Sequence, residues 1–173
     1  MQGESEKSRS VLERRARELA KPVEDHGVED GTELLVFELC GERYALESAM
    51  VREIRRLQGL TALSGVPSFV LGIMNVRGEI LSVLDPVKIL ALPETAYEDG
   101  ARVVVLSDGA MTFGLAVHGL HGMARRAFSK LQEAPLAGKG FSQGLIRGVS
   151  ADRLIVLDGK ALLAEKTLIV DGS

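Results

Sequence analysis

The sequence contains no tryptophan, a single cysteine and only three histidines. One cysteine, Cys40, cannot form a disulfide within the chain, and it does not fit a zinc ligand set. His118 and His121 are close in sequence, but no cluster of cysteines or carboxylates accompanies them. We interpret both as surface or packing residues and expect no metal site. The scarcity of cysteine favours a reducing compartment, the cytoplasm.

The motifs that mark common catalytic and cofactor sites are also missing. The sequence has no Gly-x-Ser-x-Gly turn, no His-Glu-x-x-His pair and no Gly-x-Gly-x-x-Gly turn. Cys40 falls in a predicted strand without a helix start that would activate its thiol, so a buried structural role is expected. We therefore predict a protein that is not an enzyme and binds no cofactor. The alternative is a small enzyme with an unfamiliar site, which would require a deep pocket with clustered, perturbed ionisable groups.

Neither an excess of basic residues nor a long apolar run is present. The formal net charge is -3 and the pI is about 5.7, which argues against nucleic acid as the main partner. The only uncharged stretch long enough to span a bilayer, residues 58–76, contains Gly65, Pro67 and further breakers, so we predict loop and strand there. Residues 1–10 are polar and charged where a secretion signal needs an apolar run. We expect a cytoplasmic protein without direct membrane insertion.

What the sequence does contain is the composition of a β-rich globular protein. Hydrophobic residues make up 46% of its 173 residues, enough for one compact core, and 19 glycines indicate many turns. Residues 1–32 differ, because they are highly charged and nearly free of aromatic and β-branched residues. The capping-box spacing at Ser10 predicts a short helix near residues 10–21. This extension is either a tether with blocks of opposite charge or a solvated tail, and we expect it to be dispensable for folding.

Two hairpins are predicted from residue 34 onward. Residues 34–40 and 43–46 flank a glycine turn, and residues 103–106 and 111–117 flank Asp108-Gly109, a pair suited to a type I′ turn. Large and small residues alternate along 111–117, which is typical of a half-buried strand. The small-residue face, around Gly114, would allow another backbone to approach closely. About seven short strands are expected in all, including residues 73–76, 80–84 and 154–157.

Helical structure is predicted at only a few places in this part of the chain. Asp85-Pro86 indicates a helix start, because aspartate caps free N–H groups and proline is tolerated at the first helical position. Residues 161–164 indicate a second short helical turn. The segment from Leu46 to Leu57 fits both a helix and a strand, and periodicity alone does not decide between them.

Residues 69–85, Phe-Val-Leu-Gly-Ile-Met-Asn-Val-Arg-Gly-Glu-Ile-Leu-Ser-Val-Leu-Asp, closely resemble the signature segment of CheW-like domains. In that family an Asn-x-Arg-Gly turn links two strands and an aspartate follows. Other segments agree in the same order: the hairpin at 34–46, Val-Arg-Glu-Ile at 51–54, the apolar strand at 113–117 and the closing turn and strand at 145–158. The resemblance extends over residues 33–165 and leaves 166–173 as a tail.

The resemblance implies an all-β fold with short helices, built from two intertwined five-stranded SH3-like β-barrel subdomains around separate cores, with a groove between them. It also implies a helical turn near Ser48 and a strand from about Val51. Ile54 would point inward, and Val51 and Glu53 would lie side by side on the exposed face. Family members are non-enzymatic adaptors in bacterial chemotaxis, which couple chemoreceptors (methyl-accepting chemotaxis proteins) to the histidine kinase CheA.

The implied partners are the helical-hairpin tip of a chemoreceptor and the regulatory domain of CheA, at receptor arrays on the inner face of the membrane. Turn and cap roles are implied for Asn75, Gly78 and Asp85. The alternative is a CheW-like scaffold of a different chemosensory kinase pathway, serving motility or development. Three positions depart from the family pattern and could alter the kinase-facing surface: Pro86, Ala91 where glycine is frequent, and His118 where aspartate is frequent. The receptor-binding residues implied by the match are Val51, Glu53 and Arg77, with Val103 and Val104 as weaker candidates.

Overall fold

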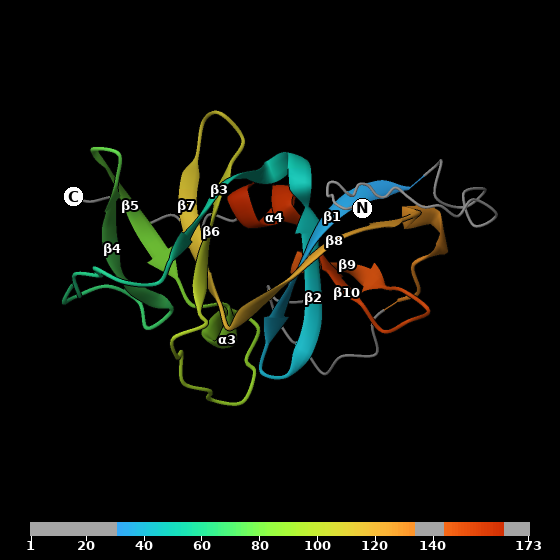
Figure 1. Ribbon diagram of the computed structural model, residues 1–173, viewed down its shortest axis with the longest axis horizontal. Coiled ribbons are helices and arrows are strands. Elements are labelled where there is room, and N and C mark those ends of the chain that lie inside the picture. Colours follow the sequence, from blue (N-terminus) through green and yellow to red (C-terminus); the bar gives the residue numbers. More distant parts are fainter. Residues whose placement is uncertain (1–30, 134–143, 165–173) are drawn as a thin grey trace, which may run out of the picture. The chain divides into compact units, whose positions relative to one another are not determined.

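A computed structural model of the chain describes residues 31–133 and 144–164 (Figure 1). The chain divides into two compact units, residues 1–32 with 125–128 and residues 33–124 with 129–173. In the described part of the smaller unit, Nη1 of Arg125 donates a hydrogen bond of 3.1 Å to the carbonyl oxygen of Gly31. The helix predicted near residues 10–21 and the predicted tail at 166–173 lie outside the described residues. The features discussed below belong to the larger unit, apart from the first residue of β1, the last two of β8 and the first of η2.

The first sheet of the larger unit has five strands in the order β8-β1-β2-β10-β9. Strands β1 (Thr32–Leu39) and β2 (Glu42–Glu47) form the predicted first hairpin, with Leu39 paired to Glu42. Both residues of its turn, Cys40 and Gly41, have positive φ, 53° and 81°, as a type I′ turn requires. Cys40 therefore lies in a turn and not in a strand, and it is only partly buried. The other members of the sheet are β8 (Gly119–Arg126), β9 (Ile146–Val149) and β10 (Ile155–Leu157).

The second sheet also has five strands, in the order β3-β6-β7-β5-β4. The chain completes β1 and β2 in the first sheet, forms all of the second sheet, and then returns to the first with β8, β9 and β10. This exchange confirms the expected fold of two intertwined five-stranded units. Strands β3 and β4 are the two edges of the second sheet. Its members are β3 (Val51–Arg56), β4 (Val70–Val76), β5 (Glu79–Leu84), β6 (Arg102–Ser107) and β7 (Thr112–Val117).

Three of the short helical segments lie where the sequence or the resemblance predicts them. A 3₁₀ turn, η1 (Ser48–Met50), precedes β3, which settles the ambiguous segment as a turn followed by a strand. Helix α3 (Pro86–Ile89) begins after Asp85, and helix α4 (Gly159–Ala164) includes the predicted turn at 161–164. A further 3₁₀ turn is η2 (Phe128–Lys130).

The hydrophobic interior differs from the expected pair of separate cores. The larger cluster draws on both sheets, since it joins Phe37 and Leu39 of β1 to Leu106 of β6 and Leu115 of β7. A smaller cluster lies within the second sheet alone; its members are Met74, Val76, Leu81, Val83, Val103, Val105 and Ala116. The two sheets are therefore held together by a common core, and only the smaller cluster belongs to one sheet.

The hairpin of β6 and β7 forms as predicted, but its turn does not. Ser107 pairs with Thr112, which leaves a loop of four residues, and among them only Gly109 has positive φ. The Asp108 carboxylate accepts hydrogen bonds from the backbone N–H groups of Ala110 and Met111, at 2.9 and 2.8 Å. These bonds lower the pKa of Asp108. A side-chain-capped loop therefore replaces the predicted type I′ turn.

Strand β7 is buried on both faces and not on one. It lies in the middle of its sheet, so Leu115 faces the larger cluster while Ala116 faces the smaller one. A Cβ atom on Gly114 would lie 2.5 Å from Cγ1 of Val103. The small residues of this strand therefore make room for a neighbouring side chain, and not for the backbone approach that the alternation suggested.

Candidate functional site

The Asn-x-Arg-Gly segment forms a two-residue turn between β4 and β5. Val76 pairs with Glu79, and the turn residues Arg77 and Gly78 have φ values of 55° and 86°. Oδ1 of Asn75 accepts a hydrogen bond of 2.9 Å from the backbone N–H of Gly78. Asn75 and Gly78 thus have the turn roles expected of them. A left-handed conformation is unfavourable for arginine by about 1–2 kcal/mol, so its presence here calls for a reason beyond the turn itself.

Asp85 caps helix α3 and also fastens the loop that follows it. The residue is only 4% exposed, and its Oδ1 accepts bonds from the N–H of Val87 at 3.0 Å and from the hydroxyl of Tyr97 at 2.6 Å. Burial, and then the bond to Asp85, raise the pKa of Tyr97. The cap role of Asp85 is as expected. The contribution of Tyr97 was not foreseen, because nothing in its local pattern indicates a buried partner.

The ring of Tyr97 stacks on His118, with centroids 4.4 Å apart. Nδ1 of His118 accepts a hydrogen bond of 3.2 Å from the backbone N–H of Cys40, and Nε2 lies 3.2 Å from the carbonyl oxygen of Thr95. Since Nδ1 is an acceptor here, the ring carries its proton on Nε2 and donates to Thr95. His118 is therefore a packing residue, as interpreted from the sequence, that joins the β1–β2 turn to the loop between α3 and β6.

Glu53 lies at the centre of a group of arginines at the edge of the second sheet. One of its oxygens, Oε1, is 3.5 Å from Nε of Arg55 and 3.7 Å from Nε of Arg77, and the other, Oε2, is 3.6 Å from Nε of Arg52. Arg52 also donates to Oε1 of Glu79 at 3.1 Å. We call Arg52, Glu53, Arg55, Arg77 and Glu79 the arginine–glutamate cluster. Three arginines against two glutamates leave it one positive charge in excess.

The members of this cluster differ greatly in exposure. The side chain of Glu53 is 16% exposed, whereas that of Arg77 is 77% exposed and has a single ion pair in the described residues. Loss of the Arg77 side chain would leave Glu53 with Arg52 and Arg55, so no carboxylate would be stranded. An exposed pair of this kind contributes little to stability. Arg77 is thus free to serve a partner.

A β-bulge in β3 overturns the expected arrangement of its side chains. The register shifts between Val51, paired with Leu106, and Glu53, paired with Val105. Paired residues of antiparallel strands point to the same face, so Val51 and Glu53 lie on opposite faces. They do not form the expected exposed pair. Val51 packs, partly buried, against the larger core.

Ile54 and the two valines of β6 also differ from expectation. Ile54, expected to point inward, is 37% exposed, because it lies on an edge strand. Val103 and Val104 are wholly buried, at 0% exposure, in the smaller and larger core respectively. Their side chains are not available to a receptor, and their role is packing. Of the five residues implied as a receptor surface, only Glu53 and Arg77 come together.

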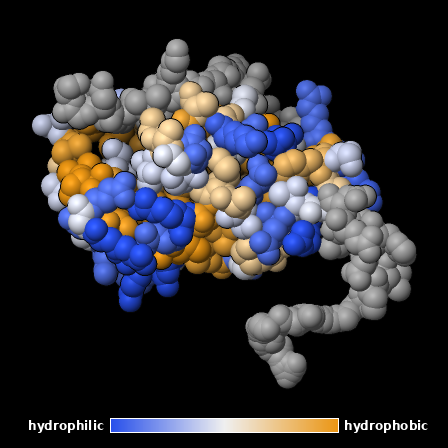
Figure 2. All heavy atoms as spheres, turned by 90° about the horizontal axis from the view of Figure 1, so that it is seen from above, coloured by the Kyte–Doolittle hydropathy of each residue, from blue (hydrophilic) through white to orange (hydrophobic). Residues whose placement is uncertain are grey.

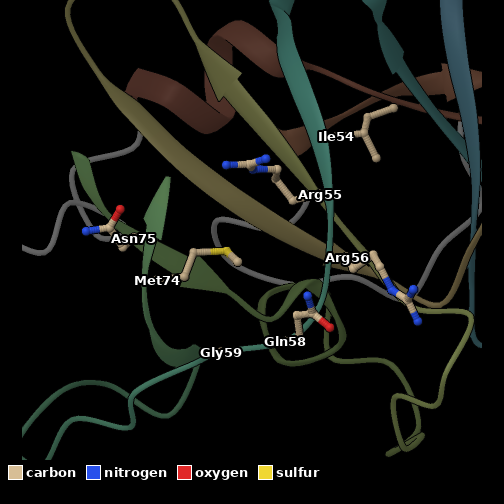
Figure 3. A pocket seen from close by; sticks show the side chains of 7 residues that line it. All are labelled: Ile54, Arg55, Arg56, Gln58, Gly59, Met74 and Asn75. Atoms are coloured by element: carbon tan, nitrogen blue, oxygen red, sulfur yellow. The ribbon is translucent and has the colours of Figure 1, made fainter. Parts of the chain in front are cut away.

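A pocket of about 540 Å³ opens beside the cluster, between the edge strands β3 and β4 (Figure 3). Figure 3 shows the Arg55 side chain directed from β3 toward Met74 and Asn75 of β4. Ile54 and Arg56 leave β3 on the opposite side. The lining is completed by residues at the start of the loop that follows β3. All the lining residues are Ile54, Arg55, Arg56, Gln58, Gly59, Met74 and Asn75.

Apolar side chains are exposed near these charges and elsewhere on the unit. Ile80, which pairs with Asn75, is 58% exposed, and Met123 of β8 is 53% exposed. In Figure 2, hydrophilic clusters alternate with apolar surface over the face that is seen. Exposed apolar groups bordered by charged groups are typical of protein–protein interfaces.

Two features of other functional classes are absent from the described residues. Within residues 31–133 and 144–164, no group of three or more histidine, cysteine, aspartate or glutamate residues is placed to hold a metal ion. In the same part of the chain, no helix has the length and apolar character needed to cross a membrane.

Comparison with known proteins gives one consistent result. The sequence model of the CheW-like domain matches residues 33–167. The chain is 28% identical over 145 residues to the chemotaxis protein CheW of Klebsiella aerogenes, covering 82% of this chain and 87% of that protein. It is 29% identical over 119 residues to Protein FrzA of Myxococcus xanthus, covering 69% of this chain and 74% of that one.

A solved structure has the same fold. The crystal structure of the scaffolding protein TtCheW from Thermoanaerobacter tengcongensis superposes with a TM-score of 0.65 at 22% sequence identity. The superposition covers 73% of this chain and 88% of the other. At this identity the likeness concerns the fold, which agrees with the two five-stranded sheets described above.

Proposed function

The chain belongs to the CheW-like domain family, and from that premise we propose that it is a non-enzymatic adaptor that couples chemoreceptors to the histidine kinase CheA in chemotaxis. The observation that carries the proposal is the match of residues 33–167 to the family together with the turn that displays Arg77. An adaptor of this kind works by holding two partners in a fixed relation. Its function therefore depends on the residues exposed at its surface.

We propose that Arg77 and Glu53 form the receptor-binding determinant. Three observations support this. The Arg77 side chain is largely exposed, and the residue has a backbone conformation that disfavours arginine. Its one ion pair among the described residues, at 3.7 Å, is weak because it is exposed. A guanidinium offers five donors in a planar fork, which suits carbonyl and carboxylate groups on a docked helix.

The remaining members of the cluster would hold this determinant in place. Arg52 joins Glu53 of β3 to Glu79 of β5, so it ties the edge strand to the hairpin that carries Arg77. Arg55 holds Glu53 from the other side. Charges at the rim of an interface fix the register of a bound element, while exposed apolar groups such as Ile80 supply buried area.

The experiment that tests this function is a binding assay with both partners. The full chain is titrated against a receptor-tip fragment and, separately, against the regulatory domain of the kinase from the same host. The adaptor role predicts binding to each. The absence of binding to either partner contradicts it. We place the protein in the cytoplasm at receptor arrays; the single cysteine of the chain is in keeping with a reducing compartment.

A second candidate is an adaptor for a different chemosensory kinase pathway. The chain is 29% identical to Protein FrzA and 28% identical to the chemotaxis protein CheW. The similarity to Protein FrzA favours this second candidate. Purification of the tagged chain from its host, followed by identification of the kinase that accompanies it, distinguishes the two pathways.

A further inference from the structure

The pocket between β3 and β4 is lined by hydrogen-bond donors, two of which have no acceptor among the described residues. Oδ1 of Asn75 is occupied by the N–H of Gly78, an arrangement that fixes the amide orientation and leaves the NH₂ group of Asn75 to donate. Within the described residues, neither this NH₂ group nor the side chain of Gln58 has a hydrogen-bond partner. The Arg55 guanidinium enters the pocket from the opposite wall. No carboxylate lines the pocket.

The charge on Arg55 is only loosely compensated. Its partner is Oε1 of Glu53 at 3.5 Å, and the same oxygen lies 3.7 Å from Arg77. One carboxylate thus serves three arginines, because Arg52 takes the other oxygen. An anion in the pocket would give Arg55 a partner of its own without stranding Glu53, which keeps Arg52 and Arg77.

The size and the apolar part of the lining restrict the occupant further. Ligand pockets measure roughly 300–1,000 Å³, and this one, at about 540 Å³, exceeds what a bare inorganic anion fills. Met74 contributes an apolar wall beside the donors. The complementary ligand therefore has an anionic head and an apolar body.

We propose that this pocket is a binding site for a carboxylate or phosphate group carried on an apolar body, with Arg55, Asn75 and Gln58 as its donors. When the anion binds, Arg55 pairs with it in place of Glu53, and the Glu53 carboxylate then pairs only with Arg77 and Arg52. Occupancy of the pocket is thereby coupled to the receptor-binding determinant; this second step rests on the proposed function, whereas anion binding itself does not.

Phenyl phosphate is a suitable probe, because it combines both features, and phenol is its neutral control. The full chain is titrated with each at constant ionic strength, and the side-chain N–H signals of Arg55 and Asn75 are followed by NMR. We expect saturable binding of phenyl phosphate in the millimolar range and none of phenol over the same concentrations. Binding of both probes alike, or a shift without saturation, overturns the proposal.

Arg55→Gln and Arg43→Gln provide a matched pair of variants. Both remove one arginine charge, but Arg55 is directed into the pocket (Figure 3), whereas Arg43 lies in β2 of the other sheet and does not line it. We expect Arg55→Gln to weaken phenyl phosphate binding at least about tenfold, equivalent to about 1.4 kcal/mol, and Arg43→Gln to leave it nearly unchanged. An equal loss in both variants indicates a diffuse basic surface and overturns the site. Retained thermal unfolding midpoints show that both variants are folded.

A competition experiment identifies the source of the anionic group. If a receptor-tip fragment displaces phenyl phosphate from the wild-type chain, the group belongs to an acidic residue of that partner. If the two bind together, it belongs to a small metabolite, and the affinity for the fragment should then change on addition of phenyl phosphate. Independent binding without such a change overturns the coupling. Failure of the fragment to bind at all counts against the proposed function and leaves the phenyl phosphate result intact.

Discussion

Oε1 of Glu53 lies 3.7 Å from Nε of Arg77, so a carboxylate on the edge strand β3 meets the turn between β4 and β5. The two residues are unequal partners. Glu53 is partly buried and has two further arginines, whereas Arg77 is exposed and has no other ion pair in the described residues. Loss of the Arg77 side chain is therefore expected to affect binding much more than stability.

Arg77→Ala is expected to weaken binding of a receptor-tip fragment about thirtyfold, a loss of about 2 kcal/mol, as truncation of an interface hot spot does. Unfolding should shift by less than about 1 kcal/mol, because the side chain is exposed and Glu53 keeps two arginines. Calorimetry at fixed ionic strength measures the first quantity and chemical denaturation the second.

Arg77→Lys and Arg77→Asn serve as controls for this prediction. Lysine keeps the charge without the planar fork and should restore binding only in part. Asparagine tolerates the left-handed conformation and should preserve or slightly raise stability without restoring binding. Wild-type affinity in Arg77→Ala, or unfolding of that variant, would remove the basis for assigning the residue to the receptor.

Phe113→Ala tests the assignment of the larger core. The ring is 5% exposed and belongs to the cluster shared by both sheets. Its removal is expected to cost about 3–5 kcal/mol, measured as a shift of the denaturation midpoint. Because this cluster joins the sheets, both should unfold in a single transition. Two separate transitions in the variant would show that each sheet has an independent core.

Ala91→Gly should stabilise the protein. The N–H groups of Ala91 and Leu92 bond to the carbonyls of Lys88 and Val87, at 3.2 and 2.8 Å, which is the Schellman pattern at the end of α3. Ala91 has a φ of 57°, where glycine carries no steric penalty. A gain of about 0.5–1 kcal/mol in the free energy of unfolding is expected. A loss would mean that the alanine methyl group makes a packing contact worth more than the strain.

The raised pKa of Tyr44 predicts that the folded protein loses stability at alkaline pH. Burial raises its pKa from 10.0 to about 12, so the folded state binds its proton more tightly than the unfolded state. The resulting stabilisation is complete below pH 10 and is lost as the pH rises toward 12. Free energies of unfolding measured between pH 8 and 11.5 should fall more steeply for the wild type than for Tyr44→Phe. Parallel curves would contradict a buried phenol at this position.

The sequence predicts best those features that are encoded locally. The turn chemistry of Asn75 and Gly78 and the cap at Asp85 need only neighbouring residues, and the structure has both. Glycine is frequent in the family at position 91, and the positive φ of Ala91 explains that preference. The expectation of two intertwined five-stranded units came from the resemblance and not from periodicity.

The failures arise where tertiary structure overrides local pattern. A single bulge in β3 reverses the faces of Val51 and Glu53, and no residue type in that segment marks it. The resemblance implies a surface position for Val103 and Val104, yet β6 lies inside its sheet and both of its faces are covered. The sequence does not indicate Glu79, because its contact with Arg52 joins β5 to β3, which are not neighbours in the sheet. It does not indicate Arg55 either, although Arg55 lies on the same strand as Glu53, because periodicity alone leaves the conformation of that segment open.

The most direct test of the adaptor role is whether one copy of the chain holds both partners at once. A receptor-tip fragment, the kinase regulatory domain and the full chain are mixed, and the masses of the complexes are measured by analytical ultracentrifugation. The adaptor role predicts a ternary complex that requires the chain and that Arg77→Ala reduces to the binary complex with the kinase domain. Two mutually exclusive binary complexes, or a ternary complex that forms without the chain, would contradict it.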